Sequence, residues 1–349
     1  MITHSKPTLG VDDYRSVMDV LESGQLVQGE QVAGFEDALS SFAGVRNGVA
    51  VSSGTSALHL SLIALGAGKG DEVIIPSYVC SALLNAVLYV NAVPVIADID
   101  RTTFNIDVDD LKKRITKRTK AIIVPHMFGL PAEINEIMSL GIPVIEDCAQ
   151  SIGAKYQGRY TGSFGVCSIF SFYATKMLAT GEGGMILSDD DRLTGVARGL
   201  RDYDEKDGYS VRYNYKMTDM QAALGISQLK KLPSFIERRR EIAGLYDKSL
   251  RNISFPFPSV PEGREHIYYR YVLSLDDSSG FIKEMLKLGI GCRRPVFKPL
   301  HEYLGLFGYP AAEEAMARAV SIPLYPSLKD EEARKITGGM VDRLMGLRL

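Results

Sequence analysis

Three short stretches of the sequence carry side chains that could perform chemistry together. Ser53-Gly54-Thr55 follows a strand pattern and opens an apolar helix, where free N–H groups and a hydroxyl could hold a phosphate. Asp147 follows another strand pattern, and a carboxylate buried there needs a cationic partner because an unpaired one is costly to bury. Lys176 stands in an uncharged, aromatic, glycine-flanked stretch, where a deprotonated amine would be a nucleophile.

Each stretch also has an ordinary alternative. Ser53 to Thr55 could be a plain helix cap, and Lys176 could be a surface lysine in a loop. The cation that faces Asp147 could be Mg²⁺ or a protonated heterocyclic nitrogen. A metal is the less favoured of these two, because the neighbouring carboxylate of Glu146 should point to the opposite face of its strand. We therefore expect no metal site.

Taken together, the stretches match the requirements of pyridoxal 5'-phosphate. Its aldehyde forms a Schiff base with a lysine, its phosphate needs N–H and hydroxyl donors, and its ring nitrogen needs a carboxylate to stay protonated. The lysine would be Lys176, the phosphate donors would come from the Ser53–Thr55 stretch, and the carboxylate would be that of Asp147. Ser171 adds a hydroxyl five positions before the lysine. We therefore expect this cofactor.

The elements that must position these residues alternate between strand and helix patterns. Strand patterns lie at 49–52, 72–75, 93–97, 121–124, 143–146, 167–171 and 185–188, and helix patterns between them include 57–65, 80–90 and 132–140. Such alternation predicts an α/β fold with a mainly parallel sheet covered on both faces. Ligands of such sheets bind beyond the carboxyl ends of the strands, where all three stretches fall.

The last third of the chain has a different character. It predicts a long helical region from Thr218 to about Leu250, interrupted near Pro233. Further elements are a strand at 269–275, a helix at 281–288, a strand at 291–296 and helices near 312–319 and 330–345. This pattern is typical of a smaller α+β domain. We expect a large domain over residues 1–240 and a small C-terminal domain over residues 241–349.

Composition excludes several classes of partner. The 349 residues include 40 basic and 42 acidic side chains, a net charge of −2, so there is no basic excess to neutralise a nucleic acid. Residues 73–97 are uncharged and long enough to span a bilayer, but Pro76 and Pro94 break the stretch. The four cysteines lack metal-ligand spacing, and the N-terminus lacks an apolar signal core. We expect a cytoplasmic protein with no nucleic-acid or membrane partner.

Longer motifs carry a family resemblance. They are Ser52–Leu60, Gly70–Ser77, Glu146–Gln150, Ser171–Lys176, Gly181–Gly184, Tyr213–Met217 and Gln221–Gly225. In this order, and over nearly the whole chain, the sequence resembles the DegT/DnrJ/StrS family of sugar aminotransferases. These enzymes belong to fold type I of the pyridoxal-phosphate enzymes, in the aspartate aminotransferase superfamily.

The resemblance implies a role for each matching residue. Lys176 would carry the Schiff base and move the proton, and Asp147 would pair with the ring nitrogen. The further cofactor contacts would be Gln150 near the phenolic oxygen, and Gly54, Thr55 and Ser171 on the phosphate. Asn214 would reach the phosphate of the neighbouring subunit, which implies a homodimer with shared active sites. His301 would contact the sugar nucleotide. Cys80 stands where the family usually stacks an aromatic ring on the cofactor, and Tyr78 is a candidate substitute.

The implied function is the transfer of an amino group, with glutamate as the expected donor, to a keto-sugar nucleotide in amino-sugar and polysaccharide biosynthesis. Alternatives are a non-sugar keto substrate and a non-catalytic, cofactor-binding regulator or scaffold of the same fold. A sugar dehydratase of this fold would have histidine in place of Lys176, so the lysine argues against it. A metal-dependent α/β enzyme that uses Asp147 is the remaining competitor.

Overall fold

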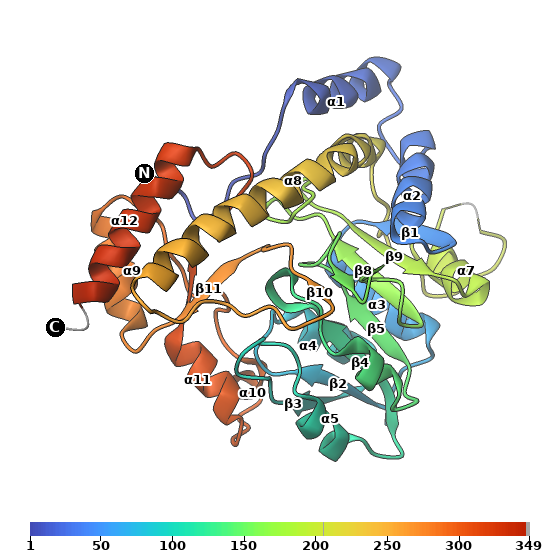
Figure 1. Cartoon of the computed structure of the whole chain (residues 1–349). Coiled ribbons are helices and arrows are strands. Elements are labelled where there is room, and N and C mark those ends of the chain that lie inside the picture. The colour runs from blue at the N-terminus through green and yellow to red at the C-terminus, as the bar shows by residue number, and fades with distance from the viewer. Residues whose placement is uncertain (205, 347–349) are drawn as a thin grey trace.

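The computed structural model describes residues 1–204 and 206–346. Its centre is a seven-stranded sheet with helices on both faces (Figure 1). The strands, in chain order, are β1 (Asn47–Val51), β2 (Glu72–Pro76), β3 (Val93–Ala97), β4 (Thr119–Pro125), β5 (Val144–Asp147), β8 (Cys167–Ser171) and β9 (Gly184–Ser188). They lie side by side in the order β1-β9-β8-β5-β4-β2-β3.

The sheet is mainly parallel. The five neighbouring strands from β8 to β3 run parallel to one another, and β9 runs antiparallel to both of its neighbours. The α/β class predicted from the alternating patterns is therefore confirmed. Val73, Ile74 and Ile75 of β2 are fully buried, as expected where helices cover both faces. The carboxyl ends of the parallel strands open on one shared edge.

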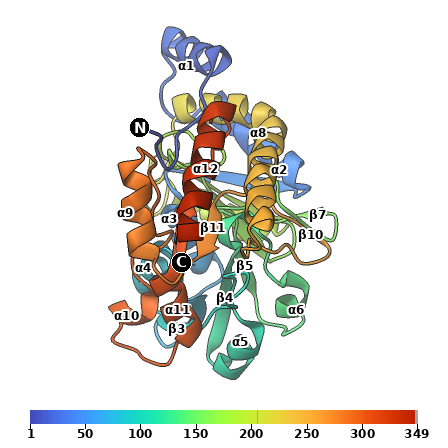
Figure 2. The same ribbon diagram turned by 60° about the vertical axis from the view of Figure 1, so that its left-hand side comes forward.

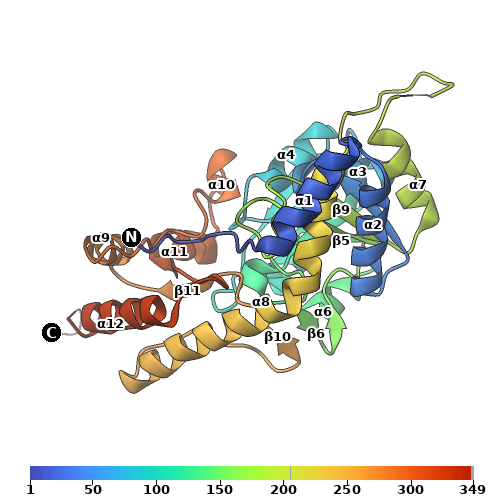
Figure 3. The ribbon, with the colours of Figure 1, turned by 90° about the horizontal axis from the view of Figure 1, so that it is seen from above.

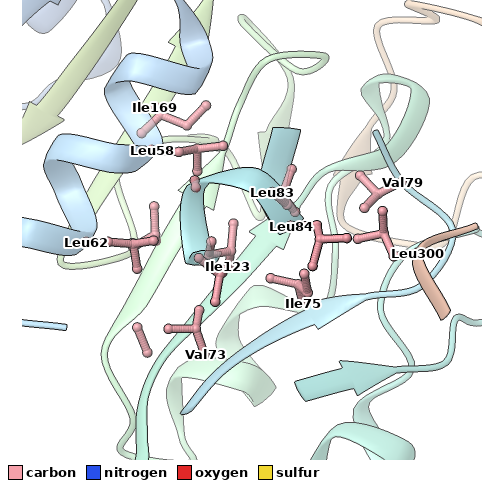
Figure 4. Packing of buried hydrophobic residues seen from close by; sticks show 14 of the residues in the cluster. Leu58, Leu62, Val73, Ile75, Val79, Leu83, Leu84, Ile123, Ile169 and Leu300 are labelled. Carbon is pink, nitrogen blue, oxygen red and sulfur yellow. The ribbon is translucent and has the colours of Figure 1, made fainter. Parts of the chain in front are cut away.

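Helices α3 (Gly54–Ala64) and α4 (Ala82–Tyr89) cover one face of the sheet. Both are apolar on nearly every side, because they are enclosed between the strands and other parts of the chain. Figure 4 shows their side chains over the strands: Leu58, Leu62, Leu83 and Leu84 lie near Val73, Ile75 and Ile123. Burial of each leucine contributes roughly 2 kcal/mol. This packing fixes the start of α3, on which part of the site is built.

Other helices complete the large domain. They are α1 (Val11–Ser23), α2 (Glu30–Ala43), α5 (Val108–Arg114), the short 3₁₀ turn η1 (Met127–Gly129), α6 (Ile134–Met138) and α7 (Asp191–Leu200). Helix α2 and the first part of α8 (Asp219–Asn252) share a second apolar cluster with β1, β8 and β9, on the face away from α3. Helix α1 projects from the body of the molecule (Figure 2).

The C-terminal part has its own apolar cluster. Its antiparallel pair of strands is β11 (Tyr271–Ser274) and β12 (Ala319–Ile322). Helices α9 (Ser278–Lys287), α10 (Leu300–Tyr303) and α11 (Pro310–Arg318) lie between these strands in the chain, and α12 (Asp330–Gly346) follows β12. A small sheet of β6 (Lys155–Tyr156), β7 (Arg159–Tyr160) and β10 (Arg264–Glu265) links it to the large domain. Helix α8 packs in both clusters, so the expected domain boundary at residue 240 cuts this helix.

Three expectations about the last third were wrong. Helix α8 runs through Pro233 without a break; burial of Leu232 and Phe235 on either side outweighs the cost of proline, roughly 3 kcal/mol. Residues 291–296 form no strand, and Arg293 makes only an isolated bridge to Ser321. Strand β11 pairs instead with β12. The sequence predicts only helices near 312–319 and 330–345 in this part of the chain, and no strand between them.

No helix within the described residues combines the length and the apolar character needed to cross a bilayer. The uncharged residues 73–97 form β2, α4 and β3, as their prolines indicate.

Candidate active site

Two consecutive carboxylates end strand β5 and point to opposite faces of the sheet. Asp147 lines a cavity, and one of its oxygens accepts the N–H of Ala149 at 2.9 Å. Within the described residues no other hydrogen bond reaches this carboxylate. Burial raises the pKa of Asp147, and the Ala149 N–H, Lys176 and His126 offset this effect only in part. The carboxylate is therefore open to one further cationic partner.

The start of α3 forms the second part of the site. The Ser53 hydroxyl caps the helix by accepting the N–H of Ser56 at 3.0 Å. The next N–H groups, of Gly54 and Thr55, belong to the first turn, where no intrahelical acceptor exists. A Cβ on Gly54 would lie 2.9 Å from Cβ of Ser171, so glycine is needed for the end of β8 to approach. Backbone donors and hydroxyls thus converge in a cradle for an anion.

A closed loop between β8 and β9 holds Lys176. Phe172 donates its N–H to the carbonyl of Gly183 at 2.9 Å, and Lys176 donates its own to the carbonyl of Tyr173 at 2.8 Å. Met177, the next residue, is buried in the cluster beneath the loop. Anchored on both sides, the loop directs the lysine side chain into the cavity that Asp147 lines.

This cavity of about 280 Å³ is close to the lower end of small-molecule sites, roughly 300 Å³. Seven of the nine predicted site residues line it: Gly54, Thr55, Cys80, Asp147, Gln150, Ser171 and Lys176. The Gln150 Oε1 accepts the N–H of Phe128 at 3.0 Å, which leaves its amide NH₂ free to donate. Apolar Leu58 and Ile169 complete the wall.

Cys80 lies at the cavity, but Tyr78 does not. The Tyr78 side chain is fully buried in the core, and its hydroxyl donates to the carbonyl of Ala315 at 3.3 Å. The suggestion that Tyr78 replaces an aromatic ring over the cofactor was therefore wrong. Cys80 itself is exposed and lines the pocket, so a thiol occupies this position.

Tyr269, at the start of the small domain, lies below Lys176. The Lys176 Nζ is 5.3 Å from the centre of its ring, a distance typical of a cation–π contact. Burial alone raises the pKa of Tyr269, but Lys176, Arg270, a hydrogen bond with Thr175 and Arg239 together lower it to about 8. Sequence reasoning missed Tyr269 because its strand pattern gave no sign of which element it would face.

The two remaining predicted residues lie elsewhere. His301 is buried, and its Nδ1 is 2.6 Å from the Ser77 hydroxyl while its ring stacks on Tyr309. It does not line the cavity, so its contact with a sugar nucleotide stays a prediction. Asn214 is exposed before α8, between Tyr213 and Tyr215, whose N–H groups donate to the carbonyls of Leu200 and Arg201. Helix α8 itself runs from beside α1 and α2 toward α12 (Figure 3).

On the other face of β5, His126, Glu146 and Cys148 place their ligand atoms within 4.8 Å of one another. The ligand atoms of His126 and Glu146 are already hydrogen-bonded. The His126 Nδ1 accepts the N–H of Ala132, so its Nε2 carries the proton and donates it to Glu146 at 3.0 Å. The Glu146 carboxylate also accepts backbone N–H groups of Gly162, Phe164 and Gly165. This cluster is therefore a structural hydrogen-bond network.

The fold and the cavity define a transferase of fold type I. Over the whole length of both chains the structure matches the aminotransferase TlmJ from Streptoalloteichus hindustanus, with a TM-score of 0.96 and 32% identity. It also matches the PLP form of Spr1654 from Streptococcus pneumoniae, with a TM-score of 0.90, 28% identity and coverage of 98% and 99% of the two chains.

Sequence comparison gives the family. The profile of the DegT/DnrJ/EryC1/StrS aminotransferase family matches residues 7–341. The GDP-perosamine synthase of Escherichia coli O157:H7 is 34% identical over 347 residues, which cover 94% of each chain. The chain belongs to this family, and it is an aminotransferase.

The residues present fit pyridoxal 5'-phosphate. The start of α3 and the hydroxyl of Ser171 offer donors to a phosphate, and the buried Asp147 carboxylate has a free oxygen for a ring cation. The Lys176 amine opens on the same cavity. A phosphate cradle, a carboxylate and a lysine in one pocket are what this cofactor requires.

Proposed function

We propose that this protein transfers the amino group of glutamate to a keto-sugar nucleotide, with pyridoxal 5'-phosphate held in the cavity between α3, β5 and β8. One observation carries the proposal: Lys176 and Asp147 line the same cavity as the free N–H groups at the start of α3. The nucleotide-sugar substrate is supported by the name of the GDP-perosamine synthase relative.

Each residue would have one task. Gly54, Thr55 and Ser171 would hold the phosphate, Gln150 would donate to the phenolic oxygen, and Cys80 would lie against the ring. The bound cofactor supplies an aldehyde that condenses with amines and a ring that accepts electrons from a breaking bond. The negative charge of Asp147 keeps the ring nitrogen protonated.

Proton transfer would fall to Lys176. Its Nζ would hold the cofactor at rest and, once the amine of the donor has replaced it, would be free to accept a proton from the donor and to give it back. The ring of Tyr269, whose centre is 5.3 Å from the Lys176 Nζ, would help to position the amine. The apolar wall of Leu58 and Ile169 keeps water from the reacting atoms.

A spectroscopic experiment tests this proposal. The purified protein with cofactor should show a visible absorption band that disappears on addition of glutamate and returns on addition of a keto-sugar nucleotide. Lys176→Ala should lose both the band and turnover, whereas the exposed Lys69→Ala should keep them. A band that glutamate leaves unchanged would favour a cofactor-binding scaffold. Recovery with simple keto acids, and with no keto-sugar nucleotide, would favour a non-sugar substrate.

We further propose a homodimer that shares its active sites. Helix α1 presents an exposed apolar stripe to solvent: Val11, Tyr14, Met18 and Leu21 are each 47–60% exposed. A second copy of the chain would cover an apolar stripe of this kind. Asn214, exposed and outside its own cavity, would then complete the phosphate site of the partner.

Mixed dimers test this arrangement. Lys176→Ala and Asn214→Ala, each weak or inactive alone, should regain activity when mixed, because one of the two sites then has both native residues. Mixing that restores no activity, in dimers confirmed by light scattering, would place Asn214 outside the partner's site. A cytoplasmic location remains part of the proposal, supported by four cysteines that form no disulfide.

A further inference from the structure

Three tyrosine rings gather around His59 of helix α3. The centre of the His59 ring lies 5.4 Å from that of Tyr89 and 4.9 Å from that of Tyr213, and both contacts are edge-to-face. The ring of Tyr215 lies edge-on at 6.0 Å from His59 and stacks on Tyr213 at 5.0 Å. We call these four residues the His59 cluster. Its members lie outside the cavity that holds Lys176, so the proposed reaction leaves their arrangement unexplained.

His59 is the member that contacts all the others. Its Nδ1 lies 3.2 Å from the Tyr215 hydroxyl, and within residues 1–204 and 206–346 this hydroxyl has no other hydrogen bond. The His59 side chain is 5% exposed, and burial lowers its pKa, so the ring is neutral at neutral pH. His59 therefore acts on the tyrosines through its hydrogen bond and its ring contacts, and not through a charge.

The backbone from Tyr213 to Tyr215 is anchored on two sides. On one side, the N–H of Tyr213 donates to the carbonyl of Leu200 at 2.8 Å. The N–H of Tyr215 donates in the same way to Arg201 at 2.9 Å. On the other side, the carbonyl of Tyr215 accepts the N–H of Ser52 at 2.8 Å, one residue before the cap of α3. The segment therefore lies beside the start of α3.

The two tyrosines determine where Asn214 points. Tyr213 and Tyr215 pack against the apolar cluster that contains α3, and because their rings stack, they lie on the same side of the chain. The side chain between them then points to the opposite side, and Asn214 is indeed exposed. Any contact that holds both tyrosine rings therefore also holds the direction of the Asn214 amide.

We propose that His59 is a positioning residue for the cofactor site of the partner subunit: by holding Tyr213 and Tyr215, it directs Asn214 toward the phosphate bound there. The inference rests on the proposed shared active sites and adds to them the residue that keeps the asparagine in place. Since the two copies of a symmetric dimer make the same contacts, each α3 serves two sites. Its first turn serves its own subunit, and His59, further along the helix, serves the partner.

Titration of the cofactor-free protein with pyridoxal 5'-phosphate tests this role without turnover. Asn214→Ala should weaken binding about 10- to 100-fold, as expected for a lost hydrogen bond to a charged group. His59→Leu should weaken it about 3- to 10-fold, in the range of a lost neutral hydrogen bond. Tyr215→Phe, which removes only the hydroxyl that faces His59, should weaken it about 2- to 5-fold. Tyr160→Phe, which removes a hydroxyl from the small β6–β7–β10 sheet, is the matched control.

The double variant shows whether His59 acts through Asn214. If it does, adding His59→Leu to Asn214→Ala should change the affinity by no more than about twofold, because no asparagine is left to position. Two losses that multiply in full would mean that His59 acts on its own cradle or on the fold, and would overturn the inference. Normal affinity of Asn214→Ala would overturn the shared site as well. If the wild-type protein binds no cofactor, the proposed function itself fails.

Mixed dimers, isolated with two affinity tags, show in which subunit His59 acts. When a Lys176→Ala chain is paired with a chain that keeps this lysine, the one active site takes Asn214 from the Lys176→Ala chain. His59→Leu on the Lys176→Ala chain should therefore raise the cofactor concentration for half-maximal activity about 3- to 10-fold. On the other chain it should change this concentration less than about twofold. The reverse result, or no effect from either chain, would overturn the inference. If His59→Leu does not fold, Tyr215→Phe replaces it in both experiments, with the same direction expected.

Discussion

The two acidic residues at the end of β5 are neighbours in the sequence, but their surroundings are opposite. Glu146 accepts four hydrogen bonds and is fully buried, whereas Asp147 accepts one and faces a cavity. Burial alone would raise both pKa values. For Glu146, His126 and the backbone N–H groups of Gly162 and Gly165 reverse the effect and lower the pKa, whereas the pKa of Asp147 stays raised.

In our proposal, the difference separates a carboxylate that stabilises the fold from one that binds a ligand. Glu146 holds the loop at 162–165 against β5, and there Gly165 is required because a Cβ would lie 2.4 Å from the carbonyl of Val144. Asp147 lacks such partners, so its ionised form is poorly stabilised until a cation arrives. A site prepared in this way costs stability in the free protein and gains affinity for the cofactor.

The largest effect is expected from Asp147→Asn, which should separate function from folding. Turnover of the holoenzyme should fall at least about 100-fold, because a neutral amide does not keep the ring nitrogen protonated. The cofactor-free variant should be as stable as wild type or more so in urea unfolding, since it no longer buries a poorly paired charge. Asp189→Asn, on an exposed aspartate, is the control. Wild-type turnover would contradict the assigned role.

Glu146→Gln should show the reverse pattern. The NH₂ of the glutamine amide would face backbone N–H groups from which the carboxylate accepted hydrogen bonds, and it cannot accept them. The free energy of unfolding should therefore fall by about 3 kcal/mol. The fraction that remains folded at low temperature should keep nearly normal turnover per active site, counted by bound cofactor. If stability were unchanged while turnover collapsed, the contrast between the two carboxylates would be reversed.

The smallest effect is a pH dependence of opposite sign at the two sites. Glu146 has a lowered pKa, so its stabilisation is present above its unfolded value near 4.5 and is lost as the pH falls through the folded value. Asp147 has a raised pKa, so its relative destabilisation appears as the pH rises. In urea unfolding of the cofactor-free proteins, the effect of Asp147→Asn should shrink between pH 7 and pH 4, and the effect of Glu146→Gln should shrink as the pH falls below about 4.5. An effect of either variant that is constant over its own range would contradict its pKa shift.

The sequence predicts those parts of the site that are formed by short, continuous stretches of the chain. Gly54, Ser171 and Lys176 belong to short motifs at strand ends, so their types and spacing predict one cavity. Tyr269 and Arg270 belong to a strand pattern of the small domain. Such a pattern predicts a strand, but it does not predict which residues of the large domain the strand will contact. Tyr78 was misassigned for the same reason, since adjacency to Cys80 in sequence does not fix the direction of a side chain.

Errors in the fold arose where tertiary packing outweighs local preference. Pro233 predicts a break, but Leu232 and Ile236 on either side pack in one core, and Ile242, further along, packs in a second, so one helix is held together. Strand β12 is only four residues long, and its apolar run is as compatible with a helix end as with a strand. Its partner β11 decides between them, and this long-range pairing has no signature in the local sequence.

The uninterrupted helix α8 has a mechanical consequence. Its 34 residues extend about 50 Å at 1.5 Å per residue, and they are rooted in both halves of the molecule. A continuous helix at this junction resists hinge rotation of one domain against the other, because such a movement would have to bend the helix. Shielding of the reaction from bulk solvent therefore falls to side chains, and substrates enter a pocket whose width is already set.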